Sequence, residues 1–284
     1  MKRTVQRIFV ITLAALPLHV FAQGVDSIAA WKRTLNGMAN LSQSYFDNWT
    51  KGGTDALNWE IRFDASAVLD KPGYTWESKG KAAYGQAKLA SLAPRKSSDE
   101  LVLETIYTRK LNEWINPFAS ARLQSQFAPG YTYDDKLGTR TRVSGVFDPT
   151  YVTQTLGAGY DWRKELQLRL GGTLKETFSA VRYGYADKAS TAAVETYKIE
   201  PGATFTAIYK RGLMENILLS TLLDVFVNFK GADETDVRWE NLITAKVNKY
   251  ISANFALDML YDKDLSTERQ IKENLSIGIS FLSI

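Results

Sequence analysis

The chain has 284 residues, a formal net charge of +4, no cysteine and a single histidine, His19. The absence of cysteine excludes disulfide bonds and thiolate metal sites. Because His19 lies in a segment that we expect to be removed, the mature chain has no imidazole, which excludes a Ser-His triad, a histidine general base and histidine-bound zinc.

The N-terminal 22 residues are predicted to be a signal peptide. Lys2, Arg3 and Arg7 supply a positive start, Ile8–Phe21 is largely apolar, and cleavage is expected after Ala22. An uncleaved anchor is the alternative, but the apolar stretch is short for one. Cleavage removes three of the 35 basic residues and none of the 31 acidic ones, leaving a net charge of +1. Charge therefore gives no support to a nucleic-acid partner.

Strict alternation from Leu57 to Asp70 is the clearest pattern in the chain. Trp59, Ile61 and Phe63 fall on one face of the expected strand, and charged residues such as Glu60 fall on the other. This strand is more than twice as long as the usual 5–6 residues or so. After residue 22 there is no run of about 18 apolar residues, so a helical membrane protein is not expected. A long strand with one apolar and one polar face is typical of a barrel wall between lipid and an aqueous lumen.

The same alternation recurs along the chain, giving about twelve strands, an even number as expected for a single-chain bacterial barrel. The other predicted strands are Leu35–Leu41, Trp76–Tyr84, Leu101–Thr108, Ala119–Phe127, Val152–Trp162, Leu166–Lys175, Tyr197–Tyr209, Ile217–Phe229, Val237–Val247, Ile251–Asp262 and Leu275–Phe281.

Ile217–Phe229 is the most ambiguous of these strands. Leu218, Leu222 and Phe226 occupy the face that should be polar, and their i, i+4, i+8 spacing also suits a helix. The polar residues Ser220 and Asp224 share that face. We therefore predict a wall strand, with a helix as the alternative.

Short and long connections are predicted to alternate from end to end. The tight ones are 71–73, 163–164, 210–215 and 249–250, and the longer ones are 46–56, 89–98, 128–148, 179–196, 230–235 and 263–270. This alternation indicates short periplasmic turns, longer outer loops and both termini in the periplasm.

Aromatic residues gather at both ends of the predicted strands, as interfacial girdles do. A soluble β-sandwich or lipocalin-like barrel is the alternative, but its strands would be shorter and its outward face polar. The turn-side residues are Trp76, Trp114, Trp162, Tyr209 and Tyr250, and the loop-side residues are Trp59, Phe127, Tyr197, Trp239 and Tyr261.

The polar faces of the strands supply the candidate lumen lining. Two interpretations remain open: a charged pore that selects solutes, or a plugged barrel in which opposite charges pair across a narrow interior. The signs are mixed, so no strong ion selectivity follows. The predicted lining residues are Glu60, Arg62, Asp64, Lys79, Lys81, Arg122, Arg169, Lys198, Glu200, Arg238, Glu240 and Lys246.

A second candidate site is the loop motif Asn48, Trp49, Gly52 and Gly53. Trp49 could stack on a ligand such as a sugar. Alternatively, the motif is a tight loop in which the glycines adopt positive φ and Trp49 anchors at the membrane interface. We favour the tight loop.

The segment 128–135 has two interpretations of its own. It could fold inward as a constriction loop, or Asp134 and Asp135 could bind a cation. Adjacent carboxylates are usually solvated, and calcium normally needs six or more oxygens. No metal site is therefore predicted.

Catalysis is not expected. The acid pair Glu60 and Asp64 could support acid–base work, but the mature chain lacks histidine, cysteine and a G-x-S-x-G elbow. Gly157-Ala158-Gly159 is not a dinucleotide fingerprint, because no third glycine follows. The sequence predicts neither an enzyme nor a cofactor.

Three segments carry a resemblance to a known family. They are Leu41-Ser42-Gln43 with Asn48-Trp49-Thr50-Lys51-Gly52-Gly53, then Gln126-Phe127-Ala128-Pro129-Gly130-Tyr131, and Asp148-Pro149 with Leu156-Gly157-Ala158-Gly159-Tyr160. In their order and spacing they resemble bacterial outer-membrane β-barrels catalogued as domain of unknown function 3078. A group linked to salt-induced outer-membrane proteins is a neighbouring alternative. The resemblance implies an outer-membrane barrel and brings no established activity.

The sequence thus predicts an all-β, up-and-down antiparallel transmembrane barrel over 35–284, after a short periplasmic segment over 23–34. Its expected function is a small-solute pore, with a non-conducting structural, adhesion or assembly barrel as the alternative. The expected partners are outer-membrane lipid, lipopolysaccharide, the barrel-assembly machinery and a small solute. One departure from common barrels is that Phe281 lies three residues before the last residue of the sequence.

Overall fold

The computed structural model describes residues 31–45, 54–90, 92–163, 165–187, 192–231, 235–262 and 268–283. The predicted signal peptide and the Asn48–Gly53 motif lie outside these residues. Every regular element in the described ranges is a β-strand. In this part of the chain, no helix is long and apolar enough to cross a membrane.

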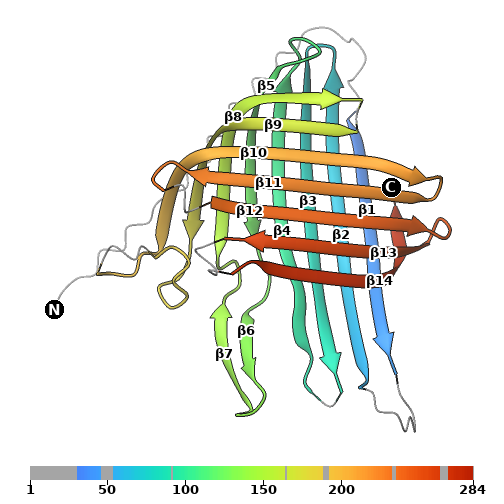
Figure 1. The fold of residues 1–284 in the computed structure, drawn as a ribbon, viewed down its shortest axis with the longest axis vertical. Helices are drawn as coiled ribbons and strands as arrows, with labels where there is room; N and C mark the ends of the chain where they lie inside the picture. Colours follow the sequence, from blue (N-terminus) through green and yellow to red (C-terminus); the bar gives the residue numbers. More distant parts are fainter. Residues whose placement is uncertain are drawn as a thin grey trace. The chain divides into compact units, whose positions relative to one another are not determined.

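Twelve strands form a closed antiparallel barrel in the order β1-β14-β13-β12-β11-β10-β9-β8-β5-β4-β3-β2 (Figure 1). The strands of the two opposite walls cross steeply in this view, because barrel strands tilt by about 35–45° from the axis. The wall strands are β1 (Lys32–Ser44), β2 (Ala56–Lys71), β3 (Tyr74–Leu89), β4 (Arg95–Arg109), β5 (Asn116–Ser125), β8 (Thr150–Trp162), β9 (Leu166–Phe178), β10 (Tyr197–Met214), β11 (Ile217–Asn228), β12 (Thr235–Lys246), β13 (Ile251–Tyr261) and β14 (Gln270–Ser283).

The prediction of twelve wall strands is confirmed, including the ambiguous segment now seen as β11. This strand pairs along its whole length with β10 and β12, so its backbone groups are bonded on both sides. Asp224 is paired in register with Thr206 on one side and Arg238 on the other. Pairing to two neighbouring strands therefore decides against the helical alternative that the apolar spacing left open.

Several strands begin earlier than predicted, and β1 and β4 show the reason. β1 begins at Lys32 rather than Leu35, and β4 begins at Arg95 rather than Leu101. These first residues are largely polar, so they carry no hydrophobic alternation, yet they pair with β2 and β3. The connection 90–94 is consequently shorter than the connection 110–115. The predicted strict alternation of short and long connections is wrong at this point.

The connection 128–148 is also more regular than predicted. It contains a hairpin of β6 (Gly130–Asp134) and β7 (Thr139–Ser144), which forms a separate two-stranded sheet. Figure 1 shows the hairpin projecting away from the barrel strands rather than folding inward as a constriction. Its tight turn uses Gly138 at φ +63°, and Asp134 accepts bonds from the backbone nitrogens of Lys136 and Leu137 at 3.0 and 3.1 Å.

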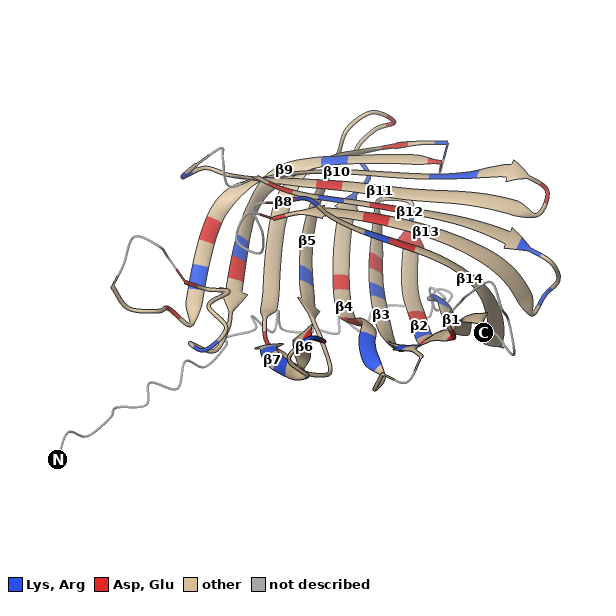
Figure 2. Ribbon diagram, turned by 60° about the horizontal axis from the view of Figure 1, so that its bottom comes forward, with Lys and Arg blue, Asp and Glu red and all other residues tan. Residues whose placement is uncertain are grey.

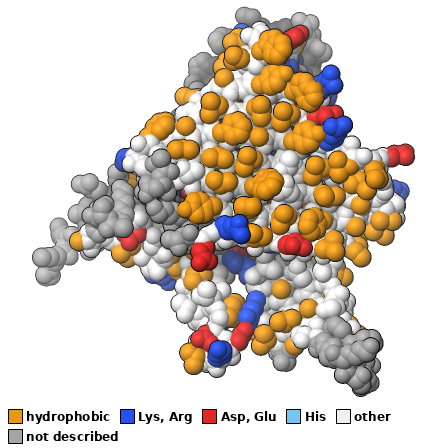
Figure 3. Space-filling model, in the orientation of Figure 1, with side chains coloured by type: hydrophobic (Ala, Val, Ile, Leu, Met, Phe, Trp, Pro, Cys, Tyr) orange, Lys and Arg blue, Asp and Glu red, His pale blue; other side chains and the backbone are white. Residues whose placement is uncertain are grey.

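The outward face of the barrel is apolar. Leu156, Leu170 and Leu275 are 71%, 62% and 67% exposed, and hydrophobic side chains cover the wall seen in Figure 3. Among the described residues, by contrast, most buried side chains are polar or charged. A water-soluble domain has the opposite distribution, because burial of apolar surface drives its folding. The protein is thus arranged with apolar side chains outside and polar side chains inside.

Both described ends of the barrel lie at the end with the tight turns. Lys32 of β1 pairs with Val68 of β2, close to the β2–β3 turn, and Asn36 of β1 pairs with Ser283 of β14. We call this the turn end of the barrel. The opposite end, which carries the β6–β7 hairpin, is called the loop end.

Candidate functional site in the barrel lumen

One ion pair identifies the inward face of the sheet. Lys175 Nζ on β9 lies 2.5 Å from Asp236 Oδ2 on β12, although β10 and β11 separate these strands in the sheet. Such a contact can only be made across the interior. Paired residues of neighbouring strands point to the same face of the sheet. Lys175 pairs with Thr153, Thr153 pairs with Arg122, and Arg122 pairs with Glu104, so these residues all point inward. All twelve predicted lining residues lie on this face.

The middle of the lumen carries a group of nine charged residues, which we call the central belt. Arg238 Nη2 lies 3.3 Å from Asp224, and Arg238 Nη1 lies 3.4 Å from Glu240. Figure 2 shows that basic and acidic positions are interspersed on the strands of both walls. The belt consists of Arg62, Asp64, Lys81, Glu100, Glu104, Arg122, Asp224, Arg238 and Glu240.

The belt charges interact across the lumen. Arg238 on β12 interacts electrostatically with Glu100 and Glu104 on β4. In the barrel order, five strands separate β4 from β12 on either side, so these two strands face each other. Lys81 and Glu100 form an ion pair at 2.6 Å, and its two side chains are 25% and 24% exposed. The belt is therefore a charged section of the lumen that is still partly open to water.

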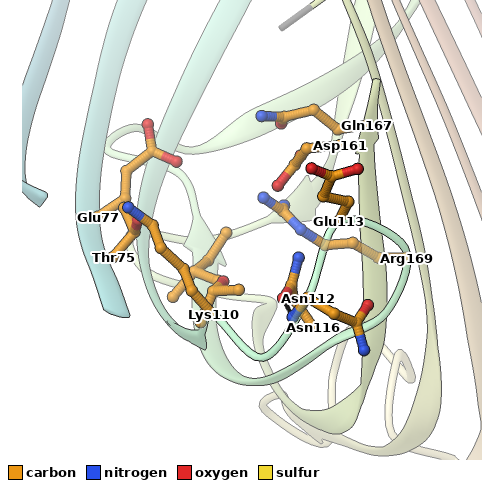
Figure 4. Close-up of a pocket in the computed structure, with 11 residues that line it drawn as sticks. Thr75, Glu77, Lys110, Asn112, Glu113, Asn116, Asp161, Gln167 and Arg169 are labelled. Atoms are coloured by element: carbon orange, nitrogen blue, oxygen red, sulfur yellow. Dashed lines mark hydrogen bonds between the residues drawn. The ribbon is translucent and has the colours of Figure 1, made fainter. Parts of the chain in front are cut away.

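A polar cavity of about 370 Å³ lies on the turn side of the belt. Figure 4 shows Thr75, Glu77 and Lys110 on one side of it and Asp161 and Arg169 on the other. The lining comes from β3, β4, β5, β8, β9 and the connection between β4 and β5. Donors and acceptors of both charge signs thus surround the space, which suits water and small hydrophilic solutes better than an apolar ligand.

A second polar cavity, of about 260 Å³, lies toward the loop end between β1, β2, β4 and β14. It is lined by Glu60, Lys272 and Glu273 together with asparagine and serine side chains. Asn40 Nδ2 donates to Glu60 Oε1 at 3.1 Å, which holds this carboxylate against the wall. The two cavities therefore lie on either side of the central belt.

A buried charge cluster occupies the loop end of the β9–β13 wall, and we call it the Lys175 cluster. Besides Asp236, Lys175 Nζ lies 3.9 Å from both Glu200 and Asp262. Lys198 Nζ lies 3.0 Å from Glu200, whose side chain is only 3% exposed. Three acidic residues thus surround two lysines in a space with little water. Buried charges of this kind are stable only as a complete set.

Two carboxylates fasten the loop-end connections to the barrel. Asp99 accepts bonds from the backbone nitrogens of Phe127 and Ala128 at 2.7 and 2.9 Å, and its side chain is 2% exposed. Asp148 accepts bonds from Ser179 Oγ and the Ala180 nitrogen at 2.8 and 3.0 Å. The hairpin and the β9–β10 connection are therefore held by charge-assisted hydrogen bonds.

Replacing Asp99 by asparagine is expected to loosen the hairpin. The neutral amide weakens two backbone hydrogen bonds and leaves Lys96, 2.9 Å from Asp99, without its carboxylate, at a cost of about 1–3 kcal/mol. Limited proteolysis within 126–149 should become faster by roughly tenfold. Asp187→Asn, at an exposed position, is the control. Equal proteolysis rates in the two variants would show that Asp99 does not anchor the hairpin.

The acidic pair of the hairpin has a structural role. Arg95 on β4 forms an ion pair with Asp135, and this hydrogen bond holds the pKa of Asp135 below its usual range. Asp134 is engaged in the hairpin turn. Among the described residues, no group of three or more acidic or histidine side chains could hold a metal ion.

Sequence reasoning missed several members of the site. Glu100 and Asp236 lie just before the predicted beginnings of their strands, and Asp224 was seen only as part of an ambiguous segment. The alternation of side chains along a strand could have indicated them, because every second residue lies on the same face. Glu100 therefore shares its face with Glu104, and Asp236 shares its face with Arg238. Extending each alternation into the polar flanks would have found them. The Asn48–Gly53 motif remains a prediction, since it lies outside the described residues.

The fold and this lumen define the class of protein: a closed twelve-stranded antiparallel β-barrel with a charged interior and an apolar exterior. Residues 41–131 match the model of the family described as "Protein of unknown function (DUF3078)". This match agrees with the resemblance seen in the sequence and covers β2, β3, β4 and β5 in full, with parts of β1 and β6. No curated protein matches the chain.

Solved structures similar to the chain are themselves β-barrels. The translocator domain of autotransporter NalP from Neisseria meningitidis is 11% identical, with a TM-score of 0.42 and coverage of 91% of each chain. An outer membrane channel from Pseudomonas putida F1 is 12% identical, with a TM-score of 0.40 and coverage of 87% of this chain and 92% of that one. The KdgM porin in complex with disordered oligogalacturonate is 10% identical, with a TM-score of 0.36 and coverage of 87% and 99%.

Proposed function

We propose that this protein is an outer-membrane barrel that passes small hydrophilic solutes through its charged lumen. The observation that carries the proposal is the pair of polar cavities, about 370 and 260 Å³, on either side of a belt whose side chains remain partly exposed. Water-filled space with mixed charges at a constriction is the arrangement by which channels admit small polar solutes.

The outward face supports the membrane location. Exposed leucines would be unfavourable in water but are expected against lipid, and exposed aromatic residues such as Trp76, Trp162 and Tyr197 lie near strand ends. Because both described barrel ends lie with the tight turns, the proposal places the turn end in the periplasm and the loop end outside. Outer-membrane lipid, lipopolysaccharide and the barrel-assembly machinery are then the expected partners, and the proposal assigns no catalytic role.

Single-channel conductance of the refolded mature chain in a planar bilayer tests the proposal. We expect discrete steps, with ion selectivity shifting toward cations in Arg62→Gln and toward anions in Glu240→Gln. Each substitution changes the net charge of the belt by one unit without a large change in volume. Lys249→Gln, at the turn end, is the control. Unchanged selectivity in both belt variants would contradict their place in the conducting path.

The second candidate function is a non-conducting barrel that acts through its outer connections. The ion pairs within the belt and the electrostatic interactions across it favour this function, because charges that neutralise one another could close a narrow lumen. Silence in the bilayer from protein shown to be inserted would favour the non-conducting barrel over the pore.

A further inference from the structure

We propose that the β6–β7 hairpin binds the phosphorylated saccharide headgroup of lipopolysaccharide through an arginine–tyrosine face. The inference rests on the outer-membrane location in the proposed function, but it does not depend on conduction. No residue of the central belt takes part in it. The face is built from the hairpin, the beginning of β4 and the β9–β10 connection.

The hairpin register places two tyrosines and two arginines on one face. Tyr131 pairs with Arg142, and Tyr133 pairs with Arg140, so all four side chains point to the same side of the two-stranded sheet. Arg140 stacks over the ring of Tyr131 at 4.7 Å, and Arg95 of β4 stacks over Tyr133 at 4.3 Å. The opposite face carries small polar threonines.

The β9–β10 connection extends this face. Arg182 and Arg142 lie 5.0 and 5.8 Å from the centre of the Tyr183 ring. Arg142 Nε also donates to the carbonyl of Ser144 at 3.1 Å. Each guanidinium is thus held near an aromatic ring, and stacking leaves its edge N–H donors available. A pre-organised planar fork of this kind suits bidentate binding of phosphate.

Charge complementarity points to an anionic partner. Arg140, Arg142 and Arg182 are exposed, and none of them forms an ion pair with any residue in the described part of the chain. Arg95, in contrast, is neutralised by Asp135. Arg140 and Arg95 each occupy one face of the Tyr131 and Tyr133 rings, which reduces the aromatic surface open to sugar rings. The unpaired guanidinium groups therefore favour recognition of the partner through its charge.

Aromatic residues at the base of the hairpin indicate where the arginine–tyrosine face would lie relative to the membrane surface. Phe127 and Phe147 stand at the two feet of the hairpin, 37% and 55% exposed, with ring centroids 6.5 Å apart. Exposed aromatic residues at strand ends mark the boundary between hydrocarbon and headgroups. The hairpin continues beyond this boundary (Figure 1), so its arginines would lie at the level of lipid phosphates. This favours the lipid over a soluble acidic polysaccharide.

Binding of lipopolysaccharide to the folded full chain in neutral detergent tests the proposal. The probes are lipopolysaccharide truncated to its phosphorylated inner core, the same lipid after dephosphorylation, and polygalacturonate as a carboxylate polymer. The variant is R140Q/R142Q/R182Q, and the matched control is R163Q/K249Q at the turn end. In that control pair, Arg163 stacks over Trp162 at 4.9 Å and Lys249 over Tyr250 at 4.7 Å.

We expect the triple variant to bind the phosphorylated lipid at least about tenfold more weakly than the wild type, and the control to bind it equally well. The arginine-to-lysine variant R140K/R142K should lose part of the affinity, because lysine keeps the charge but not the planar fork. Unboiled migration on a detergent gel verifies folding in every variant.

Three results would overturn the inference: equal binding by the triple variant, equal binding of dephosphorylated lipid, or preference for polygalacturonate. These results leave the conductance experiment untouched, so the two proposals fail separately. Fractionation of the full chain outside the outer membrane would remove the location on which both depend.

Discussion

Replacing Lys175 by methionine is expected to destabilise the barrel by about 3–5 kcal/mol. The substitution keeps most of the side-chain volume but removes the ammonium group that lies among Glu200, Asp236 and Asp262. The negative charges of these carboxylates are then less well compensated. Two of these carboxylates are at most 9% exposed, so water cannot replace the lost ammonium group. Unfolding by urea in lipid vesicles, followed by tryptophan fluorescence, measures the loss.

Two comparisons make this prediction specific to the cluster. Lys198→Met removes a lysine that lies 3.0 Å from Glu200 but keeps Lys175 among the three carboxylates, so we expect a smaller loss. Lys249→Met, at an exposed turn, should change the free energy of unfolding by less than about 0.5 kcal/mol. If Lys175→Met unfolds at the same urea concentration as Lys249→Met, the Lys175 cluster does not hold the loop end together.

The second large effect is expected at Gly157, which faces Gly171 across the β8–β9 pair. A Cβ atom at Gly157 would lie 2.1 Å from the carbonyl oxygen of Leu170 and 2.5 Å from the Cα of Gly171. The obstructing atoms belong to backbone, so a rotamer change cannot relieve the contact. Gly157→Ala should therefore cost about 1–3 kcal/mol or more through distortion of the wall.

Gly172→Ala is the matched control for this glycine. It makes the same chemical change on the neighbouring strand, where a Cβ would meet no atom within 4 Å. By restricting the unfolded chain, it should be neutral or stabilise by about 0.4–1 kcal/mol. Equal unfolding midpoints for Gly157→Ala and Gly172→Ala would show that the close approach of β8 and β9 is not required.

The pairing of Gly157 with Gly171 also explains the motif Gly157-Ala158-Gly159. The sequence alone indicated only what this motif is not. The missing third glycine argued against a dinucleotide fingerprint in Gly157-Ala158-Gly159, and the structure places these residues within β8. The reason for Gly157 itself became visible only when β9 was placed beside it, with another glycine in register. Whether a position requires glycine depends on the strand beside it, and the motif itself does not specify that strand.

Strand content was largely readable from the chain because the period of two is a local property. Each side chain in a strand points to the side opposite its neighbour, so Leu57–Asp70 reveals its two faces without any partner. The alternation disappears where both faces are polar, as at the beginnings of β1 and β4, and those boundaries were missed. In β11, apolar residues on the inward face blurred the same signal, and only pairing with β10 and β12 resolved it.

The contacts within the site could not be predicted in the same way. Side-chain alternation indicates that Arg238 points inward, but it does not show that Glu100 and Glu104 face Arg238 from β4. That relation depends on the number of strands, their stagger and the closure between β1 and β14. The same holds for Lys175, whose acidic neighbours come from β10, from β12 and from the residue after β13.

The sequence by itself determined an all-β barrel wall of twelve strands with a charged inner face. These properties follow from composition and from side-chain alternation, which act over a few neighbouring residues. Only the tertiary structure decided which charges meet in the central belt, how Lys175 is enclosed, and that 128–148 forms a hairpin with an arginine–tyrosine face. Such contacts join residues far apart in the chain, and only strand order and register bring them together.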